Sequence, residues 1–227
     1  MNLNFKPTDD EPSQQALFEV ETDQADSTDS IPEEIENFFV YRQKLDEMLP
    51  FIDPDNVDEN QSAELYRILQ FFNNIFYQSE ETELYSKLAQ IFNEQLTIEL
   101  VIATFIISCD EQIIIQCLIC FTNYYYSENS LQPFLDSADF AVKLITSINS
   151  PTPEIRVQSR NTMSNFLLDH KFYQMYDFDS LYKEFLEIQE EATNPSNSDE
   201  ISPHIFFIRF LYAMLKHDPS NSPLFDH

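Results

Sequence analysis

The chain has 227 residues, of which 43% are hydrophobic, and it carries 40 Asp and Glu against 12 Lys and Arg, a formal net charge of −28. It contains no glycine, although average usage of about 7% would give roughly sixteen, and this absence excludes P-loops, dinucleotide-binding fingerprints and nucleophile elbows. The negative charge argues against nucleic acid or an anionic membrane as partner and favours a basic protein or peptide, with simple solubility as the alternative explanation.

The first 32 residues are expected to form a disordered acidic tail, because they combine carboxylates, Ser, Thr and Gln with little apolar sequence. Residues 1–36 hold eleven Asp and Glu against a single Lys. The pattern changes at Glu33, so we expect one helical domain over residues 33–217 and a short C-terminal tail over 218–227.

From Glu33 onward the apolar residues recur at the three- and four-residue spacing of amphipathic helices. Segments 97–108 and 111–126 are apolar on almost every side, which indicates helices at the centre of the core. Alternating strand patterns are scarce and Asn-Gly hairpins cannot form, so the expected fold class is all-α. Helices are predicted over 33–49, 61–78, 81–94, 97–108, 111–126, 137–148, 153–169, 177–192 and 203–217, with a turn near 130–136 and an exposed loop over 193–202.

The helix ends must be built without glycine. Thr152 predicts a capping hydroxyl before a proline at the first helical position, and Ser202 repeats this arrangement. Asn149 is the expected left-handed residue after the helix at 137–148, since Asn is the next residue after glycine in tolerating that conformation.

The candidate metal ligands do not combine into a site. The odd cysteine count, with Cys109, Cys117 and Cys120 in one apolar stretch, is unlike a disulfide framework, and Cys117-x-x-Cys120 lacks a second ligand pair for zinc. Residues 53–64 place carboxylates at positions 1, 3, 7 and 12 of a calcium loop, but Asp58 stands where that loop needs glycine. We therefore expect buried packing cysteines, an acidic helix cap and no metal or other cofactor.

No segment predicts association with a membrane. The sequence MNLNFKPTDDEP at the N-terminus lacks the apolar stretch of a signal peptide. The longest apolar runs, near 100–107 and 113–121, are far shorter than the ~20 residues of a membrane-spanning helix. A cytoplasmic or nuclear location is the resulting expectation.

Two segments of the chain are related by an internal repeat. When Ile113 is aligned with Ile155, the apolar positions of the two segments coincide and Asn123 meets Asn165, an offset of 42 residues. An earlier segment fits the same frame more loosely, with Asn74 offset by 49 residues from Asn123. These offsets are typical of solenoids built from two or three helices per repeat.

Segment 137–168 has an apolar helix, a Ser/Asn/Pro loop and the sequence IRVQSRNTMSNFL. This segment above all, and the repeat as a whole, resembles an armadillo repeat. HEAT-type repeats fit nearly as well. This resemblance covers about residues 60–217 and implies a right-handed superhelix of about four short repeats, whose third helices line a concave groove. In peptide-binding members an Asn on that helix clamps the backbone of an extended peptide, which implies this role for Asn74, Asn123 and Asn165. The chain departs from the family in having no Trp one turn earlier and no glycine between the first two helices. Bracing of neighbouring turns is the alternative role of these Asn residues.

The expected function is therefore a non-enzymatic protein-interaction module, with a basic protein or peptide as partner and no nucleic acid, membrane or small-molecule substrate. The alternative is a structural subunit or end fragment of a larger helical assembly. A hydrolase that uses paired carboxylates ranks third, because carboxylate pairs are unavoidable among 40 acidic residues.

Overall fold

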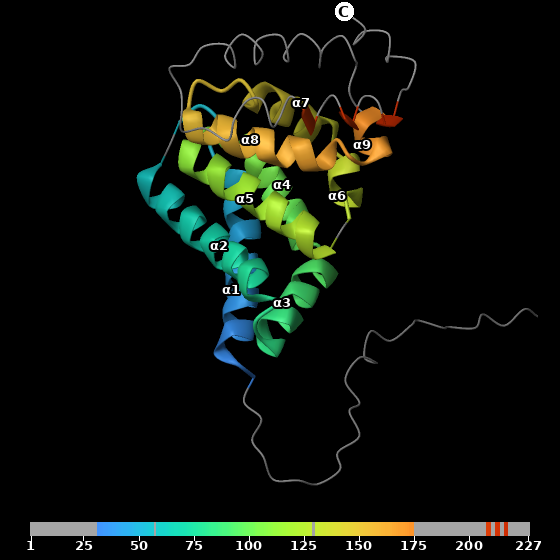
Figure 1. Ribbon diagram of the computed structural model, residues 1–227. Coiled ribbons are helices and arrows are strands. Elements are labelled where there is room, and N and C mark those ends of the chain that lie inside the picture. The colour runs from blue at the N-terminus through green and yellow to red at the C-terminus, as the bar shows by residue number, and fades with distance from the viewer. Residues whose placement is uncertain are drawn as a thin grey trace, which may run out of the picture. The chain divides into compact units, whose positions relative to one another are not determined.

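The computed structural model describes residues 31–56, 58–128 and 130–174, together with residues 208–209, 212–213 and 216–217. All regular structure in these residues is helical, with no strand, which confirms the all-α expectation for the described part of the chain (Figure 1). The tail expected before Glu33 (apart from Ile31 and Pro32), the helix expected over 177–192, the loop over 193–202 and the tail over 218–227 lie outside the described residues.

The helices follow one another with short connections. Their bounds are α1 Glu33–Met48, the 3₁₀ helix η1 Leu49–Phe51, α2 Glu59–Gln78, α3 Glu83–Glu94, α4 Thr97–Ile107, α5 Glu111–Glu128, α6 Gln132–Leu135, α7 Ala138–Ser147, α8 Pro153–Phe166 and α9 His170–Gln174.

Most differences from the predicted bounds occur at helix ends. α2 begins at Glu59, because Asp58 Oδ1 accepts hydrogen bonds from the backbone N–H groups of Asn60 at 2.9 Å and Gln61 at 3.0 Å. The acidic stretch before α2 is thus a helix cap, as expected. The turn expected near 130–136 contains the short α6, and the short α9 was not predicted.

One expected cap is wrong, and a second is right in its position but lacks the expected hydrogen bond. Asn149 does not adopt the left-handed conformation; α7 ends instead through Ile148 with right-handed backbone angles. Thr152 stands at the N-cap of α8 before Pro153, but its hydroxyl makes no capping hydrogen bond and donates to Glu111 on α5. The Thr152 hydroxyl thus bonds to a side chain on a neighbouring helix instead of capping its own helix.

The left-handed residue of the described chain is Leu96, between α3 and α4, with φ 51° and ψ 33°. Its N–H donates to the carbonyl of Asn93, and its own carbonyl accepts from the N–H of Glu99. A branched side chain disfavours these backbone angles, which glycine would adopt without steric cost. The absence of glycine therefore leaves a strained residue at this turn.

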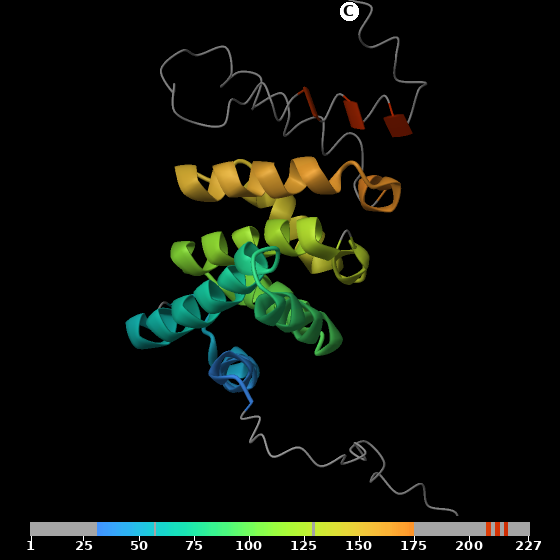
Figure 2. The same ribbon diagram turned by 60° about the horizontal axis from the view of Figure 1, so that its bottom comes forward.

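The helices pack in two sets of neighbours. α2, α5 and α8 lie side by side in that order, and Figure 2 shows them following one another in teal, yellow-green and orange. α1 packs against α4, and α4 packs against α7. α5 contacts α2, α4 and α8, and is therefore the central element, as its apolar sequence predicted.

The aligned sequence segments occupy matching places in the core. Nine paired positions on α2, α5 and α8 are each no more than 2% exposed. They are Ile68, Cys117 and Ser159; Phe72, Phe121 and Met163; and Ile75, Tyr124 and Phe166. The alignment of the three segments thus corresponds to equivalent inward faces on adjacent helices.

Polar side chains at one matching position join these helices. Asn73 on α2 donates from Nδ2 to the backbone carbonyl of Gln116 at 3.1 Å and to its side-chain Oε1 at 2.9 Å. Thr122 occupies the corresponding place on α5, and its hydroxyl lies 3.0 Å from that of Thr162 on α8. The threonine contact is buried and the Asn73 contacts are partly buried, and such hydrogen bonds add orientation to the apolar packing.

The described residues near the C-terminus continue this arrangement beyond α8. Arg209 donates to the hydroxyl of Ser164, which matches Thr122 in the alignment, at 3.0 Å. Lys216 Nζ donates to the carbonyl of Leu168 at 2.9 Å, and Ala213 is fully buried. Residues predicted to lie on a helix over 203–217 therefore pack against the end of α8.

Candidate functional site

The candidate site is the surface formed by α2, α5 and α8, because each of these helices carries one of the predicted Asn residues. We call it the Asn face. The three residues stand at paired positions of the alignment but differ in accessibility. Asn74 is exposed on α2, Asn123 is half-buried on α5, and Asn165 on α8 is only 6% exposed. The packing of the helices places Asn74 and Asn165 on the two elements that flank Asn123.

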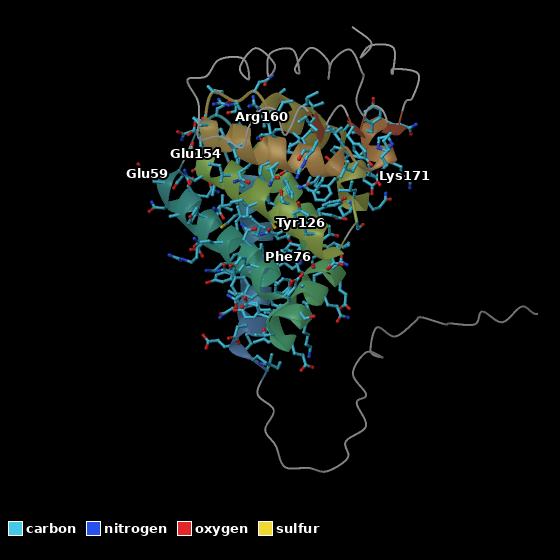
Figure 3. All side chains as sticks on the ribbon, viewed as in Figure 1. Glu59, Phe76, Tyr126, Glu154, Arg160 and Lys171 are labelled. Atoms are coloured by element: carbon cyan, nitrogen blue, oxygen red, sulfur yellow. The ribbon has the colours of Figure 1, made fainter. Side chains whose placement is uncertain are left out.

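Asn165 is held by a tyrosine from the neighbouring helix. The hydroxyl of Tyr126 donates to Asn165 Oδ1 at 3.2 Å, and Figure 3 labels Tyr126 on α5. The Nδ2 of Asn165 is buried and makes no hydrogen bond within the described part of the chain. The Asn165 amide is therefore enclosed between the helices, where a donor without a partner costs about 1–3 kcal/mol.

Two tyrosines on the same surface were not among the predicted site residues. Tyr77 is 77% exposed and Tyr126 is 65% exposed, an unusual degree of exposure for rings of this size. Each follows an Asn by three residues, Asn74 on α2 and Asn123 on α5, so that each pair lies on one side of its helix. The recurring Asn-x-x-Tyr spacing, at the 49-residue offset of the repeat, is the signal that could have found them.

The consecutive residues Tyr124, Tyr125 and Tyr126 differ in burial, because successive side chains on a helix point in different directions. Tyr124 is buried and donates from its hydroxyl to Asn93 Oδ1 at 3.1 Å. Burial, reinforced by Glu128 and Glu99, raises the pKa of Tyr124 to about 12. The Tyr125 ring packs 5.5 Å from that of Phe166. Tyr126 alone of these three is exposed.

The basic residues of the Asn face are Arg67 on α2 and, on α8, Arg156 and Arg160, which donate to the backbone carbonyls of Ser150 and Ile148. α5 contains no Lys or Arg along its whole length. Arg67, the one basic residue of α2, forms an ion pair with Glu64 at 2.7 Å. Exposed tyrosine rings attract cations through their π-faces, and the negative charge of the chain acts in the same direction.

The cysteines on α5 are packing residues, as expected. Cys117 and Cys120 are fully buried and free, and burial raises the pKa of both thiols far above the ordinary value. Their thiols therefore stay protonated and lack the reactivity of a thiolate. Within the described residues, no group of three or more His, Cys, Asp and Glu side chains is placed to hold a metal ion.

No helix among the described residues is by itself long and apolar enough to cross a membrane. The pair α3 and α4, which bends by 69° at its break, reaches the required length and apolarity only when both helices are counted together.

Comparisons with family models, with curated proteins and with solved structures found no match to this chain.

Proposed function

We propose that this chain is a non-enzymatic protein-interaction module with an armadillo-like right-handed superhelix, and that the Asn face binds a basic segment of a partner protein. The observation that carries the proposal is the recurrence of Asn-x-x-Tyr at matching positions of α2 and α5, two helices that pack side by side. The stacking of α2, α5 and α8 and their paired buried positions support the superhelix.

The proposed contacts are of two kinds: Asn amides bind the partner's backbone, and tyrosine rings bind its side chains. An Asn amide offers a donor and an acceptor, and so can pair with the N–H and C=O groups of an extended chain. Asn74 and Asn123 are accessible for this, whereas Asn165 fixes the ring of Tyr126 from behind. Tyr77 and Tyr126 would then receive Lys or Arg side chains on their exposed rings.

Selection from a random ten-residue peptide library, followed by affinity measurement, tests this function. Selected peptides should be rich in Lys and Arg, and their affinity should fall by about tenfold or more between low and high salt, because exposed charges are screened. The double variant Asn74→Ala, Asn123→Ala should weaken binding by a similar factor, since each lost hydrogen bond is worth about 1 kcal/mol.

The matched control is Gln90→Ala, which removes an exposed amide from α3, away from the Asn face. This variant should bind the selected peptides as the wild type does. Peptides without basic enrichment, or affinities insensitive to both salt and the Asn substitutions, would contradict the proposed function.

A structural subunit of a larger helical assembly is the second candidate. The exposed apolar side chains of Phe39 and Val40 on α1 and Phe51 on η1 favour it, because such groups are more often found at interfaces between proteins. Sedimentation of the full chain separates the two functions. A monomer at micromolar concentration would count against self-assembly, whereas a larger species dispersed by Phe51→Ser would support it.

A further inference from the structure

A cavity lies on α4, α6 and the two residues between α6 and α7. Its volume is about 360 Å³, which lies within the ~300–1,000 Å³ of typical ligand sites. None of its lining residues belongs to α2, α5 or α8. The cavity is therefore distinct from the surface on which the proposed function depends.

The floor of this cavity comes mainly from one side of α4. Ile102, Ala103 and Ile106 line it together with Glu99, at the three- and four-residue spacing of a single helical stripe. Pro133 of α6 adds a further apolar surface. Ala103 and Ile106 remain partly accessible, so their methyl groups are available to a ligand.

Two carboxylates from different elements stand in the cavity wall. Glu99, in the first turn of α4, is exposed, as is Asp136 at the end of α6. Asp136 Oδ1 accepts a hydrogen bond from Gln132 Nε2 at 3.1 Å, which leaves its other oxygen available. No Lys or Arg is among the lining residues of the cavity.

Lys143 lies near the cavity, but its ammonium group is bonded to backbone carbonyls and not to Glu99 or Asp136. Its Nζ donates to the backbone carbonyls of Ile106 at 3.0 Å and Ser108 at 2.7 Å. It also lies 5.3 Å from the centre of the Phe105 ring. Lys143 is therefore committed to the C-terminal end of α4.

We propose that this cavity receives an arginine side chain of a partner protein. The methylene groups of the arginine would lie on Ile102, Ala103 and Ile106, and its guanidinium would reach Glu99 and Asp136. An arginine has the apolar stem and cationic head that match such a floor and wall. Its planar fork of five donors can serve carboxylates on two elements, which a compact ammonium group does less well.

Methyl NMR of the full chain, labelled at Ile δ1 and Ala β carbons, tests the proposal with N-acetyl-arginine amide as the probe. The Ile102, Ala103 and Ile106 methyl signals should shift during the titration. The citrulline analogue has the same shape without the charge, and should bind about tenfold or more weakly because charge-assisted hydrogen bonds are lost. Equal shifts with citrulline, or no shift at these three methyls, would overturn the proposal.

Variants then distinguish this cavity from general attraction to an acidic protein. Glu99→Gln with Asp136→Asn should abolish the preference for arginine over citrulline. Glu83→Gln with Glu154→Gln removes the same amount of charge from the first turns of α3 and α8, and should retain the preference. If both pairs of substitutions had the same effect, the cavity would not be the site.

The same titration separates failure here from failure of the proposed function. The Asn74→Ala, Asn123→Ala variant should keep the arginine response of the cavity, because neither Asn lines it. Loss of that response in this variant would place the arginine on the Asn face and overturn the cavity proposal.

Discussion

At the scale of single residues, Leu96 shows what the absence of glycine costs. Its left-handed backbone angles are imposed by the turn between α3 and α4, and 55% of its side chain is exposed. For a residue with a Cβ this conformation costs about 1–2 kcal/mol. The packing of the half-exposed leucine side chain offsets only part of the cost of this backbone conformation.

Leu96→Gly is therefore expected to stabilise the protein. The gain should be about 0.5–1 kcal/mol, because relief of the left-handed strain exceeds the added freedom of glycine in the unfolded chain. Urea unfolding followed by circular dichroism measures it. Leu96→Ala is the control, since it keeps the Cβ and should give no gain. If Ala stabilised as much as Gly, backbone strain would not be the cause.

Glu64 provides a pH-dependent contact between α1 and α2. It accepts hydrogen bonds from Lys44 Nζ and Arg67 Nη1, each at 2.7 Å. The hydrogen bond from Lys44 is the main cause that lowers the pKa of Glu64 below its ordinary value. Because the folded pKa is lower than the unfolded one, this contribution to stability is present above about pH 4.3 and is lost as pH falls through the folded pKa.

Glu64→Gln should lower the free energy of unfolding by about 0.5–1 kcal/mol at pH 7, the usual size for a partly exposed ion pair. At pH ~2 the variant and the wild type should be equally stable, because the carboxyl is protonated in both states. Thermal unfolding across this range tests the expectation. Glu81→Gln, at an exposed position before α3, is the control and should leave the free energy of unfolding at pH 7 unchanged.

At the scale of elements, adjacent helices are joined by buried polar side chains as well as by apolar packing. The Thr122 and Thr162 hydroxyls lie 3.0 Å apart, and Thr162 also donates to the carbonyl of Leu118 at 3.3 Å. Removing the Thr162 hydroxyl leaves the Thr122 hydroxyl without this partner in a dry environment, whereas removing both leaves a matched apolar pair.

A double-mutant cycle with Thr122→Val and Thr162→Val should therefore be non-additive. Each single substitution is expected to destabilise by about 1–2 kcal/mol, and the double substitution by less than the sum of the two. Chemical unfolding of the four proteins measures the coupling energy. Ser79→Ala with Thr146→Val, two hydroxyls that bond only within their own helices, is the control pair and should be additive. Additive effects at Thr122 and Thr162 would show that their hydrogen bond does not couple α5 to α8.

At the scale of the whole helical region, the elements differ in how many neighbours support them. Phe121 on α5 lies in an aromatic cluster, with ring centres 5.3 Å from Phe105, 5.3 Å from Phe134 and 5.2 Å from Phe140. Leu45 on α1 is fully buried as well, but α1 is the first described helix and packs most closely against α2, η1 and α4. Opening of α1 therefore exposes less of the core than opening of α5.

Hydrogen exchange should reveal this difference. Phe121→Leu is expected to lower the protection of amides in every described helix alike, by about 1–3 kcal/mol, because it weakens the centre of the core. Leu45→Ala should lower protection chiefly in α1 and η1. Equal effects of both variants on all helices would indicate a single cooperative unit without a separable first helix.

The candidate site shows where prediction from sequence reached its limit. The repeat frame brought Asn74, Asn123 and Asn165 onto neighbouring helices, yet their different exposure depends on what packs over each helix. The neighbouring Asn73 illustrates the point: it is buried and bonded to Gln116, while Asn74 is exposed. Asn73 and Asn74 are chemically identical, and their exposure differs only because they point in different directions from α2.

For helices α1 to α5, α7 and α8, the sequence by itself determined the helical class, the spans to within a few residues and the inward faces, because hydrophobic periodicity and caps such as Asp58 act over three or four residues. Tertiary structure decided which polar groups found partners on other helices, as with Thr152 and Glu111, and which residue took the left-handed turn at Leu96. These outcomes depend on contacts between residues tens of positions apart. Such contacts exist only after the helices have packed, and local sequence preference then gives way to the geometry of the packed core.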